Sequence, residues 1–179
     1  MTRRLTTASL LLALFGFTGC GPIMFSTELK GQATVQGSAL GQLLSVFPQV
    51  GGFADLNFDQ NADFQNNKAQ RQHVKSMKAT SFTITIASPN SQDYAFLDSI
   101  EFAAKADGVA EAKIASKSNI GSLGLAAPNP TLTLDVESTD LSAFVRAPTM
   151  TIISRGTGRQ PSQDTTLEAK VKFDVGVGL

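Results

Sequence analysis

Residues 167–177 read LEAKVKFDVGV, and this stretch decides the fold class. Apolar side chains occupy every odd position from Leu167 to Val177, while charged residues and one glycine occupy the even positions. Successive side chains of a strand point to opposite faces, so a period of two predicts a half-buried β-strand.

Shorter runs with the same period recur along the chain. They cover residues 29–35, 82–86, 100–104, 110–114, 132–136 and 150–152. A further candidate strand begins at Leu56, and residues 74–79 extend the run at Phe82 backward. All 7 prolines fall outside these runs, as expected because proline cannot donate to a central ladder. About eight strands with one apolar face each predict an all-β fold, in which two antiparallel sheets pack as an Ig-like or jelly-roll β-sandwich.

Two short segments have helical rather than strand spacing. Residues 38–47 have apolar side chains at helical spacing before Pro48, namely Leu40, Leu43, Leu44 and Phe47. Asp140 can cap a turn at residues 141–145. The sequence therefore predicts one or two short helices, and leaves the polar segment 61–72 as either a loop or a surface helix.

Turn-forming residues separate the predicted strands. They are found at residues 88–90, 106–108, 128–130 and 155–158.

The composition excludes several classes of function. The chain has 179 residues, with 15 Lys and Arg against 15 Asp and Glu, so it has no net charge to attract nucleic acid. Its 1 cysteine and 1 histidine exclude a disulfide framework and clustered Cys or His metal ligands. No nucleophile elbow, phosphate loop or zinc-protease motif occurs, so we expect a protein that is not an enzyme.

The N-terminus has the pattern of an export signal. Arg3 and Arg4 precede the apolar stretch 5–17, which a helix would extend over only about 20 Å, too short to span a bilayer. The stretch ends in Phe17, Thr18, Gly19 and Cys20. Such a segment is removed from the mature protein and is excluded from the fold.

These last residues resemble the lipobox of bacterial lipoproteins, with Phe17 in place of the usual leucine. The resemblance implies cleavage between Gly19 and Cys20, diacylglycerol on the Cys20 sulfur, and a further acyl chain such as palmitate on the new amino group. More than one acyl chain gives lasting attachment to a membrane. Gly21, where an aspartate is associated with inner-membrane retention, favours the outer membrane of the cell envelope. The alternatives are an ordinary signal that leaves Cys20 as a free thiol, and a chance apolar N-terminus.

These observations divide the chain into three parts. Residues 1–19 are the predicted signal peptide, residues 20–27 a short tether of at most about 29 Å, and residues 28–179 a single sandwich domain. We expect no cofactor beyond the covalent lipid on Cys20.

One segment is rich in oxygen ligands. Carboxylate or amide side chains occupy alternate positions at Asp55, Asn57, Asp59, Asn61 and Asp63. This pattern resembles the first half of an EF-hand calcium loop, but Gln60 replaces the glycine and Asn66 the bidentate glutamate. We favour the alternative, a half-buried strand whose polar side chains are solvated.

The most promising recognition residues are Arg155, Arg159 and Asp164, which precede the last predicted strand. Binding residues often lie on loops of a rigid scaffold, although an ordinary hairpin connection explains the same residues. The sequence predicts a non-enzymatic binding, structural or assembly module, attached to the membrane and contacting another envelope protein. The alternative is a carrier that holds an apolar ligand or lipid between its sheets.

Overall fold

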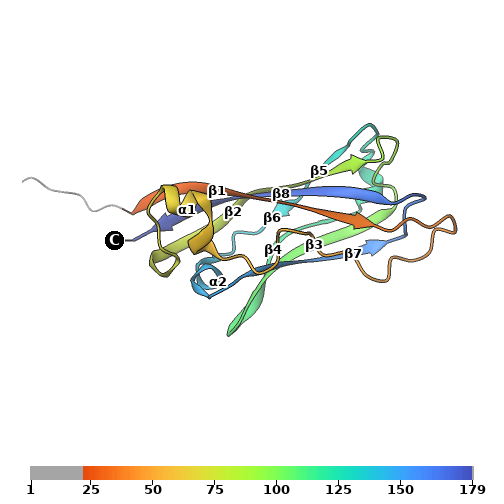
Figure 1. Cartoon of the computed structure of the whole chain (residues 1–179). Helices are drawn as coiled ribbons and strands as arrows, with labels where there is room; N and C mark the ends of the chain where they lie inside the picture. The colour runs from red at the N-terminus through yellow and green to blue at the C-terminus, as the bar shows by residue number, and fades with distance from the viewer. Residues whose placement is uncertain (1–21, 179) are drawn as a thin grey trace, which may run out of the picture.

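Eight strands form two antiparallel sheets in residues 22–178, the part of the chain that the computed structural model describes (Figure 1). The first sheet has the order β1 (Ile23–Val35), β8 (Thr165–Val177), β2 (Val74–Ser88) and β5 (Thr131–Thr133). The second sheet has the order β6 (Asp135–Val136), β4 (Val109–Ser118), β3 (Leu97–Ala106) and β7 (Thr151–Gly158). The predicted all-β sandwich is confirmed.

Short helical segments join the strands. They are the α-helices α1 (Ala62–Asn66) and α2 (Ser142–Arg146) and the 3-10 turns η1 (Phe58–Gln60), η2 (Arg71–His73) and η3 (Ile120–Leu123). Helix α2 forms at the predicted place, but its N-cap residue is Leu141, which makes no side-chain cap bond. Asp140 lies one residue earlier, and its carboxylate accepts a hydrogen bond from the Ser142 N–H at 2.9 Å. Among the described residues, no helix is long and apolar enough to cross a membrane.

Strand β8 is central in the first sheet, as its long alternating sequence suggests. It pairs with β1 on one side and β2 on the other, so that Phe173 lies between Thr27 and Ala79. Its inward side chains from Leu167 to Val177 are all buried.

Aromatic side chains fill the space between the two sheets. The Phe82 ring from the first sheet lies 4.3 Å from the Phe102 ring of the second, measured between centroids. Phe53 packs edge-on against both, at 6.1 and 6.4 Å. Each such ring contributes about 2–3 kcal/mol by leaving water, so this cluster is a principal source of stability.

The predicted run 132–136 is divided between the two sheets. The N–H of Leu134 donates to the Phe82 carbonyl in the first sheet, whereas the N–H of Glu137 donates to the Ile114 carbonyl in the second. The chain crosses the side of the sandwich here, and this crossing leaves Val136 37% exposed. The alternating pattern predicted a strand but could not show that it changes sheets.

The predicted helix at residues 38–47 is wrong. In Figure 1 this segment is the orange loop that follows the β1 arrowhead. Its main chain makes one internal turn bond, from the Gly41 N–H to the Ser38 carbonyl, and three bonds to residues 158–161. The candidate strand at Leu56 is also wrong, because only a single bridge joins Leu56 to Met150 before η1 and α1 begin. The ambiguous segment 61–72 contains α1, which buries Phe64.

Strand β1 begins at Ile23, five residues before the expected domain boundary at Glu28. Residues 23–27 of the predicted tether therefore belong to the sheet, where Phe25 packs edge-on against Phe64 at 5.2 Å. Thr27 is 2% exposed and donates its hydroxyl to Asp63 at 2.7 Å. The pairing of Ile23 with Val177 and of Val35 with Thr165 places the two ends of β1 at opposite ends of the sandwich.

Candidate functional site

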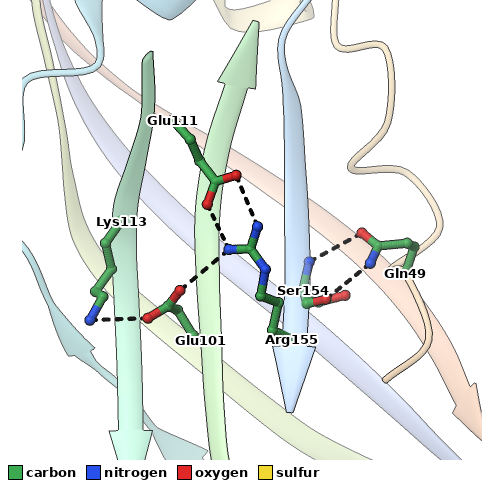
Figure 2. Close-up of polar contacts among 6 residues, drawn as sticks. All are labelled: Gln49, Glu101, Glu111, Lys113, Ser154 and Arg155. Atoms are coloured by element: carbon green, nitrogen blue, oxygen red, sulfur yellow. Dashed lines mark hydrogen bonds and ion pairs between the residues drawn. The ribbon is translucent and has the colours of Figure 1, made fainter. Parts of the chain in front are cut away.

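The three predicted recognition residues do not come together. Arg155 lies within β7, because residues 155–158 continue the strand instead of forming the expected turn. Its guanidinium makes two bonds to the Glu111 carboxylate, at 2.6 and 2.9 Å, on the outer face of the second sheet (Figure 2). Arg155 is thus part of an ion-pair network across three strands.

This network continues through Glu101, which lies between Arg155 and Lys113. Its carboxylate is 3.4 Å from the Arg155 guanidinium and 3.0 Å from the Lys113 ammonium (Figure 2). Hydrogen bonding to Arg155 holds the pKa of Glu111 below its ordinary value, and hydrogen bonding to Glu101 raises the pKa of Lys113. These four side chains pair with one another on an exposed face of the second sheet.

Arg159 and Asp164 have a different role, because both bind the main chain of residues 36–47, which we term the distal loop. The Arg159 guanidinium donates to the Gly41 carbonyl at 3.1 Å, and the Asp164 carboxylate accepts from the Gly37 N–H at 2.8 Å. Three main-chain hydrogen bonds join the same two segments. The Ser38 N–H donates to the Pro161 carbonyl at 2.7 Å, the Leu44 N–H to the Gly158 carbonyl at 3.0 Å, and the Gln160 N–H to the Gln42 carbonyl at 2.7 Å. The distal loop is therefore fixed along its length.

The distal loop nevertheless presents aliphatic side chains to solvent. Leu40, Leu43 and Val46 are 83, 74 and 76% exposed. Phe47 points the other way and is 4% exposed, its ring packed where Gly156 has no side chain to obstruct it. The helical spacing of these residues suggested a buried face, and the glycines at 37 and 41 are the sequence signal that argued against a helix.

The oxygen-rich segment uses its side chains within the protein. The Asn57 amide oxygen accepts from the Asp59 N–H at 3.0 Å, and that of Asn61 accepts from the N–H groups of Asp63 and Phe64 at 3.0 and 3.2 Å. Both asparagines are therefore helix caps, which explains why they precede η1 and α1.

The acidic side chains of this segment are separated from one another. Asp59 pairs with Arg71 at 2.7 Å, whereas Asp63 accepts the Thr27 hydroxyl. Asp55 adopts a left-handed backbone conformation with φ of 49°. In residues 22–178, no three His, Cys, Asp or Glu side chains are close enough to hold a metal ion.

The predicted site residues Gly19 and Cys20 lie outside the described residues. His73, the chain's 1 histidine, is exposed at the end of η2.

Comparisons with known proteins identify no family. No family model matches the chain, and no curated protein matches it. Among solved structures, it is similar to the "decameric BFDV Capsid Protein" at 10% identity and a TM-score of 0.40, over 88% of this chain and 100% of that one. It is also similar to the "60-mer BFDV Capsid Protein" at 12% identity and a TM-score of 0.36, over 88% and 95% of the two chains. Similarity this low supports no argument about function.

Proposed function

We propose that this chain is a lipoprotein of the bacterial cell envelope, anchored through Cys20, that acts as a non-enzymatic binding module. Its contact surface for another envelope protein is the distal loop. The observation on which this proposal rests is the exposure of Leu40, Leu43 and Val46 on a loop whose backbone is fixed by hydrogen bonds.

Exposed aliphatic side chains on a rigid loop are suited to binding. Burying a leucine or valine contributes about 1.5–3 kcal/mol, and this free energy is available only on association when the free protein leaves the residue in water. A fixed loop also loses little conformational entropy when it binds. The charged groups beside it, Arg159 and Asp164, already bond to the loop's own main chain. The distal loop is therefore better suited to bind an apolar pocket of a partner than a charged surface of one.

The exposed aliphatic surface of the distal loop is only part of what a stable interface needs. A standard interface buries about 800 Å² on each side, which is more than three aliphatic side chains provide. A few anchor residues supply most of the binding free energy in many complexes. We therefore expect the three side chains to act as anchors within a pocket of the partner.

The position of the loop agrees with attachment through the N-terminus. Strand β1 has 13 residues and spans about 40 Å between its ends. Figure 1 shows the distal loop at the end of the sandwich opposite the described N-terminus. A lipid on Cys20 would hold Ile23 near the bilayer, so the distal loop would point away from it. We favour the outer membrane on the sequence grounds given above.

The carrier alternative receives no support from the interior. The rings of Phe53, Phe82 and Phe102 are in mutual contact where an apolar ligand would have to lie between the sheets. A bound lipid would have to displace these buried side chains.

Two measurements test the proposal. Incorporation of an alkyne-labelled fatty acid into the wild type and into Cys20→Ala tests the anchor; we expect label that depends on Cys20. A photo-reactive amino acid at Leu43 tests the contact surface, with the same amino acid at Asp107 in the β3–β4 turn as the matched control.

We expect a reproducible cross-linked product in cell envelopes from position 43 alone. Replacing Leu40 and Val46 by serine should abolish this product without lowering the melting temperature. Equal products from positions 43 and 107, or none from either, would contradict the role of the distal loop.

A further inference from the structure

The free edge of β2 is covered at two points and open between them. At one point, the Met77 N–H donates to the Asp140 carboxylate at 3.1 Å and the Met77 carbonyl accepts from the Leu141 N–H at 2.7 Å. At the other, the Phe82 carbonyl accepts from the Leu134 N–H at 2.9 Å. Between these points the covering chain leaves the first sheet to form β6 in the second.

The open part of this edge is centred on Ala79, whose side chain belongs to the core and which is 9% exposed in all. In an antiparallel ladder, the main-chain groups of alternate residues point to the same side. The groups of Met77 point away from β8, so those of Ala79, two residues on and opposite Phe173, point the same way. The hydrogen bonds that cover this edge go to Met77 and to Phe82, and none of them goes to Ala79 between them.

A groove of about 580 Å³ lies over this edge. Its lining includes Ala79 together with two exposed apolar side chains, Met24 and Val136, which are 62 and 37% exposed. A groove that reaches the edge of a sheet and has apolar side chains in its lining has the chemistry that recognises an extended peptide.

The charges of the groove favour a basic partner. Its lining contains one cation, Lys78, and two anions, Glu137 and Asp174. Lys78 and Asp174 face each other across the β2–β8 ladder, and the Ser26 hydroxyl also donates to Asp174 at 2.7 Å. Glu137 is exposed and forms no ion pair in the described part of the chain, although its charge contributes to raising the pKa of Lys113, so its carboxylate can accept a hydrogen bond from a lysine or arginine.

We infer that this groove binds an extended segment of a partner protein, which adds to β2 as a short strand. Two main-chain hydrogen bonds join the segment to Ala79, one aliphatic side chain of the segment lies between Met24 and Val136, and a neighbouring basic residue pairs with Glu137. A lipid chain is disfavoured because it would leave the donor and acceptor of Ala79 unsatisfied. The distal loop of a second copy is disfavoured because its own main chain is already bonded to residues 158–161. This site is separate from the distal loop and does not depend on it.

The first test is a titration of the full-length chain, labelled with ¹⁵N, with the capped peptide Ser-Thr-Val-Lys-Val-Thr. We expect the amide signal of Ala79 to shift saturably and its hydrogen exchange to slow by tenfold or more. The same peptide N-methylated at both valines and at the lysine should bind at least tenfold more weakly, because it lacks the donors that the Ala79 carbonyl needs.

Two substitutions distinguish binding in the groove from non-specific binding of the peptide elsewhere on the protein. Val136→Lys should weaken the peptide at least tenfold, since it adds a positive charge and removes the apolar contact. Leu123→Lys is the matched control, because Leu123 is 43% exposed and lies outside the groove, and it should leave binding unchanged. Circular dichroism of both variants checks that they fold.

Three results would overturn the inference. They are an Ala79 amide that is already protected in the free protein, no saturable shift of Ala79 at millimolar peptide, and equal binding of the N-methylated peptide.

Discussion

Gln49 substitutes for a neighbouring strand at the outer edge of β7. Its amide nitrogen donates to the Ser154 carbonyl at 3.0 Å, and its amide oxygen accepts from the Ser154 N–H at 3.1 Å (Figure 2). Ser154 is 3% exposed, so its main-chain groups have little access to water. One side chain therefore satisfies both main-chain groups of a buried edge residue, as a strand would.

Gln49→Met keeps the length of the side chain and removes both hydrogen bonds. Methionine bonds to neither Ser154 group, and a buried group left without a partner costs about 1–3 kcal/mol, so the free energy of unfolding should fall by about 2 kcal/mol or more. For a domain of this size we expect the melting temperature to fall by about 4–8 °C. The uncovered edge of β7 should also make the variant more prone to aggregate.

Gln49→Glu tests the donor separately. The new carboxylate at position 49 still accepts from the Ser154 N–H, but its negative charge repels the Ser154 carbonyl oxygen. A protonated carboxyl does not repel this oxygen. Folding should therefore raise the pKa of the new carboxyl above its unfolded value. The stability of this variant relative to wild type should be greatest below the unfolded pKa and should fall as the pH rises through the folded one.

Urea denaturation and calorimetry measure these effects. Gln72→Met is the matched control, because Gln72 is exposed and its side chain makes no hydrogen bond in the described residues. The reasoning is refuted if Gln49→Met unfolds within about 0.5 kcal/mol of wild type, the range of ordinary surface substitutions.

Three further predictions concern the rest of the sandwich. Gly31→Ala should lower the free energy of unfolding, measured in urea, by about 3 kcal/mol, because a Cβ there would collide with the Gly51 carbonyl. In the control Gly121→Ala, the atom nearest the new Cβ would be 3.6 Å away, so the loss should be below about 1 kcal/mol. Equal losses in the two variants would contradict this prediction. Phe102→Ala should lower the free energy of unfolding by about 4 kcal/mol, and a loss below about 1 kcal/mol would mean that the aromatic cluster is not packed as described. Burial opposes ionisation of Asp140, but hydrogen bonds from Met77 and Ser142 lower its pKa below 3.8 overall, so its contribution to stability is present above that pH and is lost as the pH falls through the lowered value. Asp140→Asn keeps these acceptors, so its stability should fall less than that of wild type between pH 5 and 2, and identical acid profiles would exclude this role.

Much of the fold could be predicted because a strand's side-chain period is a local property. The alternation from Leu167 to Val177 is visible in the sequence whatever the strand pairs with, and all six inward positions are buried as predicted. The turn at Asp140 is equally local, since its carboxylate bonds to a main-chain group two residues away. Both features depend on residues that are close together in the chain, so they can be inferred from the sequence alone.

The candidate sites were predicted less well because they depend on distant residues. Arg155 was expected in a loop, since its neighbours include two glycines, but pairing with β3 extends the strand through Gly158. The distal loop has helical spacing, yet five hydrogen bonds to residues 158–164 hold it in another conformation. Local propensity was overridden by partners more than a hundred residues away.

The sequence by itself determined the fold class, the central β-strand and the resemblance of Cys20 and its neighbours to a lipobox, because each depends on residues that are adjacent in the chain. Only the tertiary structure decided which apolar residues stay in water. Leu43 and Phe47 are both apolar and four residues apart, but one points to solvent and the other into the space left by Gly156. Likewise, only the crossing of residues 134–137 between the sheets leaves the edge at Ala79 open. Surfaces available for binding arise from what the rest of the chain fails to cover, and that is a property of the packed molecule.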